Sequence, residues 1–209
     1  MAQLKLIIFD CDGVMFDSKN ANRHFYNRLR TSLGHPPMDE AELEYVHMHH
    51  VTDSVSHIFR HWPEDLEKAH QLRQSLDYKD FIKHMTIEPD LVEFLELITP
   101  NYRTAISTNR TTTMSTLLDL FDLRRHFGLV VTAMDVENSK PHPDALHKIL
   151  EHFSMTAEES IFIGDSTVDF EHAAGVGMRL IAFKNPELAA DYHVSSFMEI
   201  ARLPIFGRD

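Results

Sequence analysis

The chain has 209 residues, of which 43% are hydrophobic, so it can bury a substantial core in one domain or in one domain with a small insertion. Its formal net charge of −12, from 20 Lys and Arg against 32 Asp and Glu, argues against nucleic acid or an anionic membrane surface as a partner. The single cysteine, Cys11, excludes an intramolecular disulfide and is typical of a reducing compartment. No apolar run approaches the roughly 18 residues of a membrane span, and the first residues do not resemble a signal peptide, so we expect a cytoplasmic protein.

The first predicted element is a strand over residues 4–9, which ends directly in Asp10-Cys11-Asp12-Gly13. Its nearly continuous apolar run is typical of a strand buried on both faces of a parallel sheet. Such a strand delivers its last residues to the edge of the sheet where open α/β folds bind ligands. Two carboxylates one residue apart repel each other, and a cation or a shared proton usually offsets that repulsion. An ordinary Asp- and Gly-containing turn is the alternative interpretation of these four residues.

Residues 16–85 are polar and helical in pattern, with few β-branched runs. Helices are predicted over residues 22–29, from Glu40, over residues 55–59 and from Pro63. The last of these carries apolar side chains at helical spacing. We therefore predict an all-helical insertion at residues 16–85, which separates the first strand from the rest of a discontinuous core formed by residues 1–15 and 86–209.

Strands and helices alternate in the remainder of the chain. The predicted strands cover residues 103–107, 128–132, 161–164 and 179–183. The predicted helices cover residues 89–98, 111–121, 143–153 and 170–175. This alternation favours an α/β fold with a doubly wound parallel sheet.

Three further polar clusters lie at predicted strand ends or just before helices. They are Ser107-Thr108-Asn109, Lys140 with the following Pro141-His142-Pro143, and Gly164 to Asp169. Each has a simpler interpretation as a helix cap or a turn. Because the carboxyl ends of parallel strands meet at one edge, however, we expect all three to lie close to the opening Asp pair.

This set of side chains is suited to phosphoryl transfer. Asp10 can attack phosphorus to form an aspartyl-phosphate, and Asp12 can protonate the leaving oxygen and later deprotonate water. Thr108 and Lys140 would stabilise charge on the phosphoryl oxygens. Mg²⁺ prefers hard oxygen ligands, which Asp165 and Asp169 would supply.

The same residues resemble the motifs of the haloacid dehalogenase-like hydrolase superfamily. The four motifs stand here as Asp10 to Val14, Ile106 to Asn109, Lys140 to Pro143, and Gly164 to Asp169 followed by Ala173 to Gly177. The resemblance covers the whole chain and is greatest to phosphoglycolate phosphatase-like members. It implies a Rossmann-like core with an inserted helical cap.

What the resemblance implies for the site can be stated residue by residue. Asp10 is expected to be the nucleophile and Asp12 the general acid and base. The phosphate would be bound by Thr108, with Ser107 as the alternative hydroxyl, by Asn109 and by Lys140. Mg²⁺ would be held by Asp10, the Asp12 carbonyl, Asp165 and Asp169.

Asp12 favours phosphate over carbon–halogen chemistry, since the dehalogenases of the superfamily usually lack it. A small phosphorylated metabolite is therefore the expected substrate. A sugar-phosphate mutase is an alternative, although Asn22 stands where mutases carry a cap histidine. Phosphonate or pyrophosphate hydrolysis, a receiver-like phospho-switch and a phosphate-ligand binder are the others. The sequence leaves the physiological substrate and the oligomeric state open.

Overall fold

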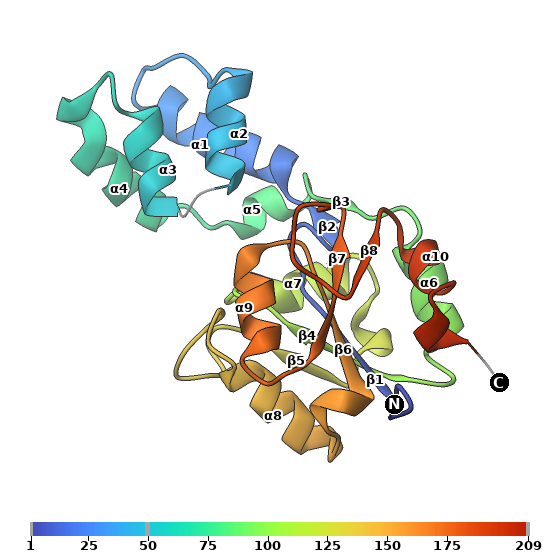
Figure 1. The fold of residues 1–209 in the computed structure, drawn as a ribbon. Helices are drawn as coiled ribbons and strands as arrows, with labels where there is room; N and C mark the ends of the chain where they lie inside the picture. Colours follow the sequence, from blue (N-terminus) through green and yellow to red (C-terminus); the bar gives the residue numbers. More distant parts are fainter. Residues whose placement is uncertain (1, 49–50, 208–209) are drawn as a thin grey trace. The chain divides into compact units, whose positions relative to one another are not determined.

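A computed structural model describes residues 2–48 and 51–207 and contains two compact units (Figure 1). One unit comprises Met1–Phe16 and Ile87–Asp209, and the other comprises Asp17–Thr86. The short strands β2 (Phe16–Asp17) and β3 (Thr86–Ile87), which pair with each other, lie where the chain passes from one unit to the other.

The larger unit is built on a six-stranded sheet in the order β5-β4-β1-β6-β7-β8. Its strands are β1 (Leu6–Phe9), β4 (Arg103–Ser107), β5 (Leu129–Val131), β6 (Ser160–Gly164), β7 (Arg179–Phe183) and β8 (Tyr192–Val194). Every neighbouring pair is parallel. The chain builds outward from β1 in one direction and later in the other, so the predicted doubly wound, Rossmann-like α/β fold is confirmed.

Helices cover both faces of this sheet. They are α6 (Leu91–Ile98), α7 (Thr113–Leu120), α8 (Asp144–Phe153), α9 (Thr167–Ala174) and α10 (Phe197–Ile200), with the short 3₁₀ turns η2 (Arg124–His126), η3 (Ala157–Glu159) and η4 (Pro204–Phe206). In Figure 1, α8 and α9 lie on one side of the sheet and α6 and α10 on the other.

All four residues of strand β1 are buried, and their side chains point alternately to the two faces of the sheet. Leu6 and Ile8 belong to an apolar cluster with α8 and α9. Phe9 points the other way, and its ring centroid lies 6.2 Å from that of Phe94 in α6 and 6.0 Å from that of Phe197 in α10. The two layers therefore fix β1, and with it the position of Asp10, in the middle of the sheet.

Several element boundaries differ from the predicted ones. The helix predicted from residue 170 begins at Thr167, because Ser166 and Asp169 form a capping box that starts it earlier. The helix predicted from Pro143 begins one residue later, at Asp144. Strand β8 was not predicted, because it has only three residues and only Val194 among them is buried.

The second unit is all helical between its ends. It contains α1 (Lys19–Ser32), α2 (Glu40–Met48), α3 (Val51–Ile58), η1 (Pro63–Asp65), α4 (Leu66–Ser75) and α5 (Lys79–Ile82). Its apolar core includes Phe25, Leu29, Val55 and Phe59, and the buried Arg30–Glu42 ion pair ties α1 to α2. The assignment of residues 16–85 as a cap domain stays a prediction. None of the helices in the described ranges is long and apolar enough to cross a membrane.

Candidate active site

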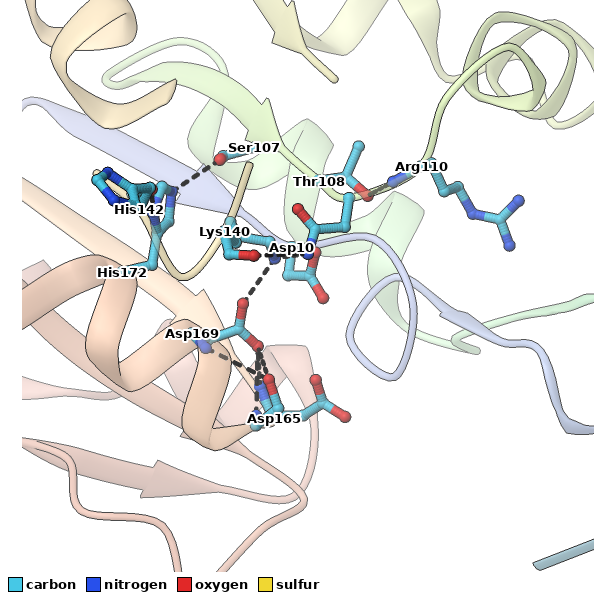
Figure 2. A network of polar contacts seen from close by, with 11 residues as sticks. Asp10, Ser107, Thr108, Arg110, Lys140, His142, Asp165, Asp169 and His172 are labelled. Carbon is cyan, nitrogen blue, oxygen red and sulfur yellow. Dashed lines mark hydrogen bonds and ion pairs between the residues drawn. The ribbon is translucent and has the colours of Figure 1, made fainter. Parts of the chain in front are cut away.

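The predicted site residues meet at the carboxyl edge of the sheet, where Asp10 follows β1, Thr108 follows β4 and Asp165 follows β6 (Figure 2). They surround a cavity of about 390 Å³ that is lined by Asp10, Asp12, Thr108, Asn109, Arg110, Lys140, Asp165, Ser166 and Val168. A larger cavity of about 1230 Å³ lies near the amino ends of the strands, beside Leu4 and Arg179. None of the described residues that line the larger cavity carries a carboxylate, so the smaller one is the candidate site.

Lys140 links two of the carboxylates. Its Nζ donates to Asp10 Oδ1 and to Asp169 Oδ1, at 2.6 Å in each case, and all three side chains are buried (Figure 2). Burial lowers the pKa of the Lys140 ammonium, but the two carboxylates outweigh burial and raise its pKa above the ordinary value. Lys140 is therefore a fixed positive charge at the base of the cavity.

The three carboxylates of Asp10, Asp165 and Asp169 each place an oxygen within 4.8 Å of the others. Burial, and then the neighbouring carboxylates, raise the pKa of Asp165 to about 8. Burial raises the pKa of Asp10 to about 7, despite the opposing effect of Lys140. One ammonium thus faces three carboxylates. A set of hard oxygen donors in which a single ammonium cannot balance three ionised carboxylates fits a divalent cation such as Mg²⁺.

Asp169 is the most firmly held of the three carboxylates. Its Oδ2 accepts hydrogen bonds from the Asp165 amide at 3.2 Å, from the Ser166 amide at 3.2 Å and from the Ser166 hydroxyl at 2.8 Å. Although burial raises the pKa of Asp169, Lys140 and these donors lower it below its ordinary value. Asp169 therefore orients Lys140 and the turn that carries Asp165.

Two glycines allow the segments to approach this closely. Gly13 has a φ of +81°, and a Cβ there would lie 2.0 Å from Asp165 Oδ2. A Cβ on Gly164 would lie 2.4 Å from the Cβ of Asp169. Any side chain at either position would displace a carboxylate of the site.

Asp12 lies at the mouth of the cavity with a side chain that is 38% exposed, and its Oδ1 accepts a hydrogen bond from Arg110 Nη2 at 2.6 Å. Arg110 also donates to Thr113 at the start of α7. Arg110 was not among the predicted site residues. Its place directly after Ser107-Thr108-Asn109 was the available signal, since that loop follows a strand at the ligand-binding edge.

The two neighbouring hydroxyl residues occupy different environments. Thr108 lines the cavity and accepts a hydrogen bond from the Arg110 amide. Ser107 is fully buried, and its hydroxyl lies 2.9 Å from His172 Nε2. Asn109 donates to the carbonyl of Lys140 at 3.0 Å, so it contacts the Lys140 loop. His172 was also absent from the prediction, and no motif pointed to it.

Cys11 is fully buried between the two aspartates of the first motif, and burial raises the pKa of its thiol well above the ordinary value. A thiol that stays protonated is a poor nucleophile. This environment fits a packing role for Cys11.

Comparison with known proteins decides the family. The model of the haloacid dehalogenase-like hydrolases matches residues 7–183, which include all four motifs. The chain belongs to this family. A HAD-superfamily hydrolase of subfamily IA from Geobacter sulfurreducens is 37% identical, with a TM-score of 0.89 and 95% of each chain covered.

Two curated relatives add to this. PpaX from Caldanaerobacter subterraneus subsp. tengcongensis, a candidate pyrophosphatase, is 26% identical over 87% of this chain and 82% of its own. A phosphoglycolate phosphatase from Salmonella paratyphi A is 38% identical, but over only 29% of this chain and 24% of its own. The protein is thus an enzyme of a hydrolase family, and these two relatives are named as a pyrophosphatase and a phosphoglycolate phosphatase.

Proposed function

We propose that this haloacid dehalogenase-like hydrolase is a Mg²⁺-dependent phosphatase, which hydrolyses a small phosphorylated metabolite through an aspartyl-phosphate. The observation that carries the proposal is the position of Lys140 Nζ, 2.6 Å from both Asp10 and Asp169, at the base of a cavity that Asp12 and Thr108 also line. A nucleophilic carboxylate, a fixed cation and a second carboxyl at one cavity are what phosphoryl transfer through an aspartate needs.

Asp10, Asp165, the backbone carbonyl of Asp12 and, behind them, Asp169 are the residues that would hold Mg²⁺. When bound, the ion would neutralise and orient the phosphoryl oxygens. Burial, together with the neighbouring carboxylates, raises the pKa values of Asp10 and Asp165, and a bound cation would favour their ionised forms, which supports this assignment.

The chain's own residues account for both chemical steps. Lys140 occupies Asp10 Oδ1, so we assign the attack on phosphorus to Oδ2. The bond from phosphorus to the leaving oxygen breaks as the Asp10–phosphorus bond forms, and Asp12 gives that oxygen a proton. Asp12 then takes a proton from water, which attacks phosphorus and releases Asp10 and phosphate. Thr108 and Lys140 hold the phosphoryl oxygens throughout.

Pyrophosphate hydrolysis is the second candidate, and the match to PpaX over 87% of this chain favours it. The same residues would serve, with phosphate as the leaving group in place of an alcohol. The phosphoglycolate phosphatase relatives favour a phosphomonoester instead, over a shorter match.

A panel of phosphomonoesters, phosphonates and pyrophosphate, assayed for released phosphate with and without Mg²⁺, tests the proposal. We expect at least one phosphate compound to be turned over, and we expect EDTA to abolish turnover and added Mg²⁺ to restore it. Undiminished activity in EDTA would contradict the role of the metal. No release of phosphate from any compound would contradict the proposed reaction.

A further inference from the structure

A buried chain of hydrogen bonds, Ser107–His172–His142, lies behind the candidate site (Figure 2). The side chains of Ser107 and His172 are both 0% exposed. His172 Nδ1 is 2.6 Å from the carbonyl oxygen of His142, and its Nε2 is 2.9 Å from Ser107 Oγ. A carbonyl only accepts, so Nδ1 carries the proton, and Nε2 accepts from the Ser107 hydroxyl.

His172 is held in one state. Burial, and then the positive charge of Lys140, lower the pKa of His172 to about 4, so the ring is neutral at ordinary pH. A neutral ring with a proton on Nδ1 satisfies both of its partners at once. The orientation of the imidazole is thereby set from both sides.

This chain of hydrogen bonds joins three segments that each carry a site residue. Ser107 directly precedes Thr108 at the end of β4, and His172 lies in α9 with Asp169. His142 lies in the loop that carries Lys140. Asn109 donates to the Lys140 carbonyl of this loop, and His172 donates to the His142 carbonyl, two residues further along it. The loop is therefore held at two points.

The position of Lys140 depends on that loop. Its ammonium makes two contacts of 2.6 Å at once, and a shift of the backbone by a few tenths of an ångström would weaken both. The ring of Phe162 lies edge-on to that of His172, at a centroid distance of 5.5 Å. An apolar side chain in place of His172 would leave the Ser107 hydroxyl and the His142 carbonyl without this partner. These hydrogen bonds therefore point to a geometric role.

We propose that His172, oriented by Ser107, is a positioning residue that holds the His142 carbonyl and so places the Lys140 ammonium for binding the phosphoryl group. The inference rests on the proposed function, because it takes Lys140 as a phosphate ligand. His172 itself touches neither the cavity nor the reacting atoms.

The test is the affinity of the full-length protein for orthophosphate with Mg²⁺ present, measured by titration calorimetry beside the melting temperature. His172→Asn places an amide near Nδ1 and retains the donor to His142, whereas His172→Gln reaches only the position of Nε2. His172→Leu removes both bonds. His126→Leu is the matched control, since His126 is also a buried histidine of this unit but lies in η2, outside the three joined segments.

We expect His172→Leu and His172→Gln to bind orthophosphate about tenfold to a hundredfold more weakly than the wild type, and to raise KM for p-nitrophenyl phosphate similarly. His172→Asn should stay within about threefold of the wild type, because it retains the bond to the loop. His126→Leu should leave the affinity for orthophosphate unchanged, whatever its effect on the melting temperature.

Wild-type affinity in folded His172→Leu would overturn the inference. So would equal affinities in His172→Asn and His172→Gln, a comparison that decides the matter if His172→Leu does not fold. Weaker orthophosphate binding by His126→Leu would overturn the inference too, because a buried histidine outside the three segments would then have the same effect. A wild-type protein that neither binds orthophosphate nor releases it from esters would overturn the proposed function, and this inference with it.

Discussion

The carboxylate of Asp12 accepts a hydrogen bond at 2.6 Å from Arg110, a residue 98 positions further along the chain. Arg110 also donates to Thr113, and its side chain is only 8% exposed. The proposed proton donor is therefore held by a buried, well-anchored guanidinium at the mouth of the cavity. The contact makes Arg110 the partner that sets where Asp12 lies.

Replacement of Arg110 by Met should lower kcat about tenfold and leave KM nearly unchanged, because Asp12 loses its anchor while the phosphate ligands remain. The loss should be larger for phenyl phosphate than for p-nitrophenyl phosphate, whose leaving group needs less protonation. Steady-state kinetics with the two esters measure this. An equal loss for both would assign Arg110 a role other than placing Asp12.

Asp10→Asn should abolish turnover, since an amide oxygen is a far weaker nucleophile than a carboxylate. Loss of the Asp10 charge should leave the fold intact, because Lys140 retains its bond to Asp169. Phosphate release and circular dichroism check the two statements. Asp119→Asn, at an exposed residue of α7, is the matched control and should retain full activity.

Asp12→Asn should slow turnover by at least about a hundredfold, since it removes the acid and the base together. With p-nitrophenyl phosphate the first step depends less on the acid. A burst of p-nitrophenol followed by a stall is therefore expected, as the phosphorylated protein accumulates. Rapid-quench kinetics and intact mass spectrometry detect the intermediate. Slow turnover without a burst or a phosphorylated species would contradict the two-step scheme.

Gly13→Ala and Gly34→Ala form a matched pair. Both glycines have a positive φ, +81° and +83°, so each substitution should cost about 1 kcal/mol of stability through backbone strain. A Cβ at Gly34 meets nothing within 4 Å, whereas one at Gly13 meets Asp165 Oδ2 at 2.0 Å. We expect only Gly13→Ala to weaken Mg²⁺ binding, measured by calorimetry. Equal Mg²⁺ affinities in the two variants would show that Gly13 does not control the placement of Asp165.

His172 should make the stability of the protein depend on pH. Burial lowers its pKa in the folded protein to about 4, from an ordinary value of 6.5. Between about pH 4 and pH 6.5, His172 is therefore protonated in the unfolded chain and neutral in the folded protein. This residue's contribution to stability is fully present above about pH 6.5 and is lost as the pH falls towards 4, by up to about 3 kcal/mol.

Urea unfolding between pH 4 and pH 8 tests this statement when wild type and His172→Gln are compared. The difference in free energy of unfolding between the two should shrink as the pH falls below about 6.5. His126, whose pKa burial also lowers, is present in both proteins and cancels in the comparison. A difference that is constant with pH would mean that His172 is protonated alike in both states.

The sequence by itself determined the fold class, and it predicted that Asp10, Lys140, Asp165 and Asp169 lie close together. It did so because strands buried on both faces, alternating with helices, admit few arrangements, and the carboxyl ends of their strands share one edge. The roles of these residues remain predictions, whereas their proximity is observed in the structure.

Only the tertiary structure decided the contacts made by side chains far apart in the chain. The pairing of Arg110 with Asp12, the separation of Thr108 from Ser107 and the bonds of His172 follow from no local pattern. Helix α9 could be expected from its sequence, but not which buried atom would meet His172. Such partners depend on how β4, α9 and the Lys140 loop pack together, and packing is set by the whole core at once.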